Sequence, residues 1–134
     1  MDKREIKFRA KGVDGEWWYG GSNPAREYRH VNLATFFANL YADQLDPATL
    51  GGYTGLYDKN GKEIYEGDIL TYNRAVLTSR YEVIIKDGHT QLILRDANVT
   101  PLHFFLDISN KDLYYIAGNI YENPELLTGV KKNE

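Results

Sequence analysis

The N-terminal part of the chain alternates between apolar and basic residues. This alternation runs through residues 6–11 and has the period of two that is typical of a half-buried strand. A turn at residues 13–15 and an aromatic run beginning at Trp17 follow, so the pattern predicts a hairpin. Because neighbouring residues of a strand point to opposite faces, we expect Trp17 and Trp18 to lie on different sides of the sheet.

A helical periodicity appears further along the chain. Apolar residues recur there at positions i, i+3, i+4, i+7 and i+8, and they are Leu33, Phe36, Phe37, Leu40 and Tyr41. This spacing predicts a short amphipathic helix over residues 33–41. Asn32 is the expected N-cap, and the aromatic stripe is interpreted as a face that packs on the core.

The middle of the chain returns to strand patterns. Residues 53–57 and 62–65 flank Asn60-Gly61, the pair preferred in a type I′ turn, so a hairpin is predicted there. Gly67 then precedes an apolar strand at residues 68–72.

Two further segments also have strand patterns. A second hairpin is predicted from residues 81–86 and 90–95, whose continuous apolar character indicates the centre of the β-core. Residues 114–121 form the last expected strand, with Gly118 as a bulge or a close backbone approach. Residues 73–80 are predicted to be a loop, and residues 98–112 have no clear pattern.

These elements predict a mainly β fold, α+β by strict count. By analogy at the level of the fold, we expect a small, partly open, SH3-like β-barrel built from hairpins, with one helix near residues 33–41. A chain of 134 residues is long enough for one domain with its own core. We therefore expect a single domain over residues 1–134, with residues 22–45 as a helix-containing insertion and residues 130–134 as a frayed tail.

Composition narrows the classes of function. The chain has no cysteine, so disulfides, thiolate metal sites and a cysteine nucleophile are excluded, which fits a reducing cytoplasm. No stretch approaches the roughly 20 apolar residues of a membrane span, so no membrane association is expected. The formal net charge of −3 gives no overall attraction to nucleic acid.

No set of residues has the spacing of a known catalytic or metal site. Glu63, Glu66 and Asp68 are close in sequence, but each lies in a predicted hairpin arm or at a strand entry, where an acidic residue has a structural explanation. The three histidines lack metal-ligand spacing; they are His30, His89 and His103. We therefore assign no catalytic, cofactor or metal-binding residue and expect no enzymatic activity.

Aromatic residues are the best candidates for contacts with a partner, because a tyrosine or tryptophan has an apolar body and a polar end. The candidate contact residues are Trp17, Trp18, Tyr53, Tyr57 and Tyr65. Basic residues next to an aromatic one could instead hold nucleic acid. The candidates for that alternative are Arg26, Tyr28 and Arg29.

Several stretches together resemble one protein family. They are REIKFRA at residues 4–10, the aromatic and glycine run around residues 17–20, YTGLYDKNGKEIYEGDIL at residues 53–70, and GNIYENPELL at residues 118–127. Their order and sequence are similar to those of the YopX family of phage and prophage proteins. The resemblance implies a mainly β fold and an origin in a bacteriophage or prophage, hence the cytoplasm of a bacterial host. It carries over no catalytic residues.

Three functions follow as hypotheses. The first is a phage or prophage accessory protein that is a non-catalytic binding or self-associating β-barrel module, which contacts a host or phage protein. The alternative is a nucleic-acid-binding β-barrel. The third is an enzyme whose site is built from residues scattered along the sequence.

Overall fold

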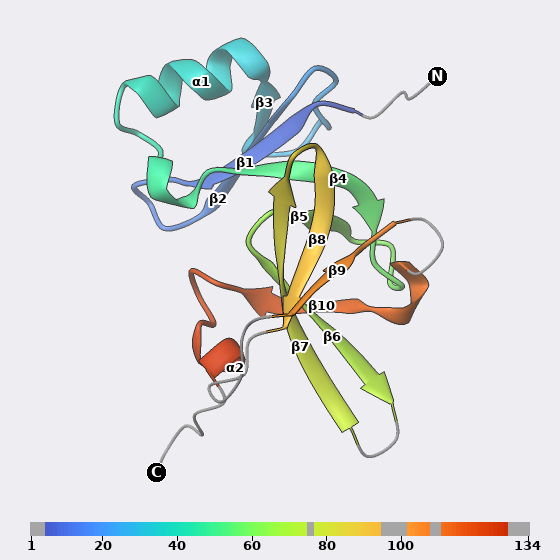
Figure 1. The fold of residues 1–134 in the computed structure, drawn as a ribbon. Coiled ribbons are helices and arrows are strands. Elements are labelled where there is room, and N and C mark those ends of the chain that lie inside the picture. Colours follow the sequence, from blue (N-terminus) through green and yellow to red (C-terminus); the bar gives the residue numbers. More distant parts are fainter. Residues whose placement is uncertain (1–4, 75–76, 95–101, 108–110, 129–134) are drawn as a thin grey trace. The chain divides into compact units, whose positions relative to one another are not determined.

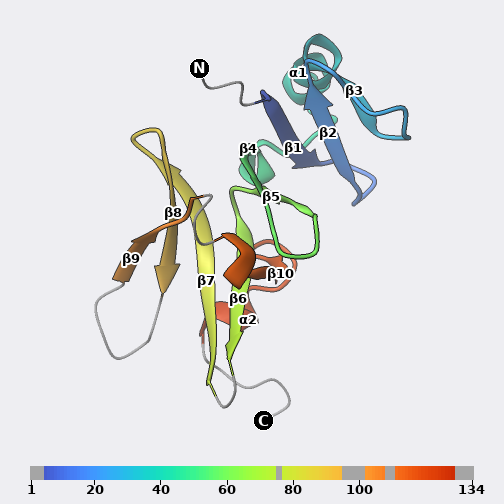
Figure 2. The ribbon, with the colours of Figure 1, turned by 90° about the vertical axis from the view of Figure 1, so that its right-hand side faces the viewer.

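The computed structural model describes residues 5–74, 77–94, 102–107 and 111–128, and these residues are mainly β (Figures 1 and 2). The elements in chain order are β1 (Lys7–Lys11), β2 (Trp17–Gly21), β3 (His30–Asn32), α1 (Leu33–Tyr41), the 3-10 turn η1 (Pro47–Thr49), β4 (Gly51–Tyr57), β5 (Glu63–Tyr65), β6 (Asp68–Arg74), β7 (Leu77–Lys86), β8 (His89–Leu94), β9 (Leu102–Phe105), the 3-10 turn η2 (Lys111–Leu113), β10 (Tyr115–Asn119) and α2 (Glu125–Thr128).

The strands form two sheets of five. One has the strand order β3-β2-β1-β4-β5 and the other the order β10-β6-β7-β8-β9. Across the described ranges neither sheet closes into a barrel. The predicted mainly β class is therefore confirmed, whereas the SH3-like barrel is not.

Contacts divide the chain into two compact units, Met1–Gly55 and Leu56–Glu134. Each unit has a hydrophobic core of its own. The core of the first unit is formed by Ala10, Phe36 and Leu45, and that of the second by Ile64, Leu70, Tyr81, Val83, Leu92, Leu106 and Tyr114. The single domain with an insertion at residues 22–45 stays a prediction, and the tail at residues 130–134 lies outside the described residues.

In the first unit, α1 begins and ends where the sequence predicts. The Asn32 side chain accepts a hydrogen bond from the Thr35 N–H at 2.8 Å, as expected of an N-cap. The helix lies against β2 and β3 (Figures 1 and 2), and its Phe36 is 1% exposed. The stripe is not a core face throughout, because Tyr41 is 92% exposed where the helix ends.

Gly20 lets the helix approach the sheet. A Cβ atom added at Gly20 would lie 2.4 Å from the Cβ atom of Phe36, far inside van der Waals contact. The absence of a side chain at this position therefore determines how closely α1 packs on β2.

In the second unit, Asp58 organises the turn between β4 and β5. Its Oδ1 accepts the N–H groups of Asn60 and Lys62, each at 2.9 Å. Gly61 has φ +83° but Asn60 has no positive φ, so the prediction of a type I′ turn at Asn60-Gly61 is wrong. Aspartate at the first position and glycine at the fourth are instead typical of a type I turn.

The Asp58 carboxylate also reaches β10. It is 3% exposed, and its Oδ2 accepts the N–H of Ile116 at 2.9 Å. The N–H of Lys59 donates to the Tyr114 carbonyl at 3.0 Å. The turn thus satisfies backbone groups along the outer edge of β10.

The strands of the second unit show one wrong prediction, the loop at residues 73–80, and one confirmed prediction, the bulge in β10. Residues 73–80, predicted as a loop, belong mostly to β6 and β7, which pair as far as Arg74 and Leu77. The predicted bulge is confirmed, since the β6–β10 register shifts between Ile116 and Gly118. Asp87 and Gly88 have φ of 53° and 78°, the left-handed pair that a type I′ turn needs.

A glycine substitution tests the contact between α1 and β2. Gly20→Ala should lower the free energy of unfolding of the first unit by about 2 kcal/mol, because the new methyl group overpacks against Phe36. Both tryptophans lie in β2, so tryptophan fluorescence during urea unfolding reports on this unit.

Gly21→Ala is the matched control. Its added Cβ would meet the flexible Lys7 side chain at 3.3 Å, so its effect should be less than half of that of Gly20→Ala. Equal effects of the two substitutions would contradict the close packing of Phe36 on Gly20.

Candidate functional site

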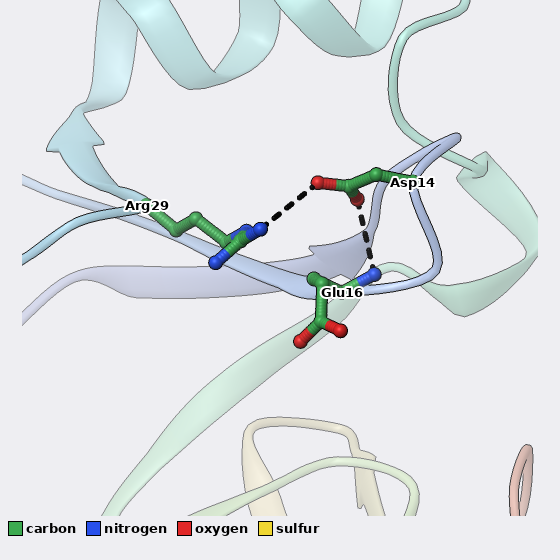
Figure 3. Close-up of polar contacts among 3 residues, drawn as sticks. All are labelled: Asp14, Glu16 and Arg29. Carbon is green, nitrogen blue, oxygen red and sulfur yellow. Dashed lines mark hydrogen bonds and ion pairs between the residues drawn. The ribbon is translucent and has the colours of Figure 1, made fainter.

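Trp18, Tyr28 and Arg29 come together in the first unit, and Asp14 joins them. Asp14 lies in the turn between β1 and β2, and Arg29 directly precedes β3. The Arg29 Nη2 atom lies 3.2 Å from the Asp14 Oδ2 atom, while Asp14 Oδ1 accepts the Glu16 N–H at 3.0 Å. Figure 3 shows both contacts and the Glu16 carboxylate pointing away from the pair.

Aromatic rings flank the guanidinium group of Arg29. Its central carbon lies 4.4 Å from the ring centre of Tyr28 and 5.7 Å from that of Trp18, within the range of a cation–π interaction. Tyr28 itself is 77% exposed. We call Asp14, Trp18, Tyr28 and Arg29 the Asp14 cluster.

The backbone of Arg29 is strained. Its φ is +71°, a left-handed conformation that is uncommon for a long side chain. The Arg29 Nε–H is also buried and has no hydrogen-bond acceptor within the described ranges. Such strain costs roughly 1–3 kcal/mol and persists only where the surroundings hold it, so the Asp14 cluster holds Arg29 firmly.

Asp14 is exposed, and its pKa lies below the ordinary value of 3.8. The main cause is the hydrogen bond from the Glu16 N–H. Hydrogen bonds from the Arg29 and Trp18 side chains and the charge of Arg29 add to it, and partial desolvation opposes it. Asp14 is therefore ionised at neutral pH.

A cavity of about 220 Å³ lies beside the Asp14 cluster. The β1–β2 turn and the end of α1 enclose it, since Gly12 pairs with Leu45 and the Val13 N–H donates to the Gln44 carbonyl at 3.0 Å. The lining residues are Val13, Asp14, Trp18, Asn39, Gln44 and Leu45. We call this space the Val13 cavity.

A more open cavity of about 400 Å³ adjoins it and shares Val13 and Leu45. Its other lining residues include Asp43 and Asp46. Asp43 is left-handed, with φ +63°. Three aspartates therefore line the two cavities, and one of them, Asp14, pairs with Arg29.

The opposite face of the β1–β2 hairpin carries cations over aromatic rings. Arg9 and Lys11 lie 4.5 and 5.9 Å from the ring centre of Trp17, and Lys7 lies 5.4 Å from that of Tyr53. Arg9 and Tyr53 are each 6% exposed. Trp17 and Trp18 thus belong to different faces, as predicted.

The remaining predicted contact residues are scattered. Tyr57 is exposed, whereas Tyr65 is 2% exposed and donates its hydroxyl hydrogen bond to Glu63 at 3.0 Å. This placement argues against a surface role for Tyr65. Arg26 is exposed and is not part of the Asp14 cluster.

Sequence reasoning missed three residues of the cavity, namely Asp14, Asn39 and Gln44. Asp14 has the character of an ordinary turn residue. Asn39 lies near the end of α1 and Gln44 three residues beyond that helix, 25 and 30 positions after Asp14. Their proximity depends on the long-range pairing of Gly12 with Leu45, which no local sequence pattern predicts.

In the second unit, β9 forms the edge of its sheet. It pairs with β8 on one side, and no strand lies beyond it in the part of the chain that the structure describes. All four of its residues are exposed, including Leu102 at 50% and Phe104 at 43%.

No group of three or more His, Cys, Asp or Glu residues is placed to hold a metal ion among the residues described. Within the same ranges, no helix has the length and apolar character needed to cross a membrane.

Comparison with known proteins identifies the family. The chain belongs to the YopX family, described as "YopX protein", whose profile matches residues 7–128. It is similar to a crystal structure of protein EF1440 from Enterococcus faecalis, with 26% sequence identity and a TM-score of 0.46, over 91% of this chain and 97% of that one. No curated protein matches.

The pKa of Asp14 gives a testable prediction. Since the folded-state pKa lies below 3.8, Asp14 contributes stability above pH 3.8 that is lost as the pH falls through the folded pKa. An NMR titration of the Asp14 carboxyl carbon should give a midpoint below 3.8.

Arg29→Gln separates the causes of this shift. The variant should raise the pKa of Asp14 yet leave it below 3.8, because the Glu16 N–H remains the larger contributor. A return to the ordinary value in this variant would show that Arg29, not the turn, controls the carboxyl group.

Proposed function

We propose that the protein is a non-catalytic binding module that self-associates through the edge strand β9. The observation that carries the proposal is an exposed apolar strand at one edge of a sheet whose other edge, β10, is bonded by the β4–β5 turn. Exposed edge strands present backbone donors and acceptors to any other strand, and proteins usually protect them with charge, proline or a covering segment.

The hydrogen bonds of β9 determine which groups point outward. Leu106 N–H donates to the Thr90 carbonyl at 3.0 Å, and the register continues through Leu92 opposite Phe104 and Ile93 opposite His103. Bonded and non-bonded pairs alternate in an antiparallel ladder. The N–H and C=O of Phe104 therefore face β8, and those of His103 face away from it.

The two edges of this sheet differ. At β10, the Asp58 carboxylate accepts the Ile116 N–H and the Lys59 N–H donates to the Tyr114 carbonyl. At β9, no charged residue lies between Leu102 and Phe105. One edge is thus blocked by its own chain, while the other carries the features of an interaction surface.

Antiparallel pairing of two copies about His103 fits this edge. The two His103 residues would exchange N–H···O=C bonds across a twofold axis. Leu102 of one copy would lie opposite Phe104 of the other, and this apolar contact occurs twice. No like charges oppose each other within the pairing.

The dimer should be weak. Two backbone hydrogen bonds contribute about 1 kcal/mol each, and the half-exposed Leu102 and Phe104 side chains have only part of their surface left to bury. Such a small contact lies at the low end of interface sizes, so we expect a Kd above about 1 μM.

From the family resemblance, we propose that the protein acts in the cytoplasm of a bacterium that carries a phage or prophage.

Substitution of His103 tests the proposal. His103→Pro removes the outward N–H without removing a bond to β8, because that N–H does not take part in the β8–β9 ladder. Sedimentation equilibrium of the full chain should show a concentration-dependent dimer for the native sequence and a monomer for this variant.

His103→Val is the matched control, since it keeps the N–H and favours a strand; it should still dimerise. Leu102→Lys should also give a monomer, because it places two like charges at the contact. A native chain that stays monomeric at all concentrations would overturn self-association, and so would dimerisation of all three variants.

Nucleic-acid binding is the second candidate, and one observation favours it. Lys7, Arg9 and Lys11 share one face of β1, next to Trp17. Arg9 is 6% exposed and Lys7 already pairs with Glu5 at 3.7 Å, so phosphate contacts are limited to two lysines at most. Two contacts on a single strand give a salt slope of only about −1.4, so this candidate ranks below self-association.

A gel shift with single-stranded DNA and RNA tests the second candidate. At about 50 mM salt, where phosphate contacts are strongest, we expect little or no retardation. Strong retardation that the double variant Lys7→Gln, Lys11→Gln removes would reverse the ranking of the two candidates.

A further inference from the structure

We propose that the Val13 cavity receives the guanidinium group of an arginine side chain from a partner polypeptide. The proposal rests on the lining of this cavity in the first unit and is independent of pairing through β9. Different experiments therefore test self-association through β9 and arginine binding in the Val13 cavity.

The polar groups of the cavity are mostly acceptors. The Asn39 side-chain NH₂ donates to the Thr35 carbonyl at 2.9 Å, and that of Gln44 donates to the Ala42 carbonyl at 3.5 Å. The amide oxygens of both residues remain to accept hydrogen bonds. The Asp14 carboxylate offers about four acceptor positions, and Glu16, Arg29 and Trp18 already donate to it. A ligand for this site should be rich in N–H donors.

Charge selects a cation among such donors. Asp14 carries a negative charge, and Asp43 and Asp46 line the adjoining cavity. Arg29 supplies the single positive charge of the Asp14 cluster. Because Arg29 balances Asp14, the excess negative charge comes from Asp43 and Asp46, and this excess favours a cation over an anion.

Size restricts the ligand to one side chain. Sites for drug-sized molecules usually enclose about 300–1,000 Å³, whereas this cavity encloses about 220 Å³. Val13, Leu45 and the Trp18 ring give it apolar walls, which suit the methylene stem of a long basic residue. The side chain that fits this cavity therefore has a charged planar group at the end of an apolar stem.

Arg29 gives an internal example of the contact. Its guanidinium already lies against the Trp18 ring and pairs with Asp14, so both partners can contact a planar cation. A second guanidinium would approach the same residues from the cavity side. Arginine is favoured over lysine because its planar group both stacks and donates several hydrogen bonds.

An NMR titration of the full chain tests the proposal. The probe is N-acetyl-arginine amide, and its neutral isostere N-acetyl-citrulline amide is the matched ligand control. Saturable shifts should appear at the Trp18 indole N–H and at the backbone amides of Val13 and Gln44. The citrulline probe should bind at least about tenfold more weakly, because it lacks the positive charge that strengthens the hydrogen bonds.

Two variants and one control locate the site. Asp14→Asn should weaken binding of the arginine probe about tenfold or more. Asn39→Leu, of similar size and favourable in a helix, should also weaken it without altering the β1–β2 turn. Asp87→Asn changes an exposed turn aspartate of the second unit and should leave binding unchanged.

A further titration with N-acetyl-lysine amide distinguishes arginine from lysine. A titration with a short arginine-containing peptide distinguishes a polypeptide from a free side chain. Tighter binding of the peptide than of the amide supports a polypeptide partner. Equal binding of arginine and citrulline, or shifts confined to residues away from Val13, Trp18 and Gln44, would overturn the proposal. So would unchanged binding in Asn39→Leu.

Discussion

A single buried carboxylate, that of Asp58, determines much of the architecture of the second unit. It accepts three backbone N–H groups, two from its own turn and one from β10. A buried charge is stable only when such donors surround it, and these donors are supplied only when the β4–β5 turn and β10 are both in place. Local turn geometry and the long-range position of the last strand therefore depend on one another.

The same carboxylate gives the sheet unequal edges. Asp58 and Lys59 engage the outer side of β10, whereas no strand lies beyond β9 in the described part of the chain. In the first unit the two faces of β2 are separated in a similar way: Gly20 brings α1 onto one face, and the row of cations with Trp17 occupies the other.

Periodicity predicted the parts of the fold that depend on neighbouring residues. The helix at residues 33–41, its Asn32 cap and the Gly118 bulge are confirmed because each is encoded within about ten residues. The prediction for the turn at Asn60 is wrong because Asp58, two positions earlier, bonds to the backbone of the turn and overrides the local preference of Asn-Gly. The Val13 cavity could not be predicted, since Leu45 and Gln44 reach Gly12 and Val13 only through tertiary pairing.

The distance along the chain between Asp58 and Ile116 has a consequence for synthesis. The two residues are 58 positions apart, and ribosomes add about 5–20 residues per second. Asp58 therefore leaves the ribosome several seconds before its last donor exists. During this interval the carboxylate has only the donors of its own turn, whereas the internal contacts of the first unit are all encoded in residues 1–55. The order of translation thus favours completion of the first unit while the second waits for its final strand.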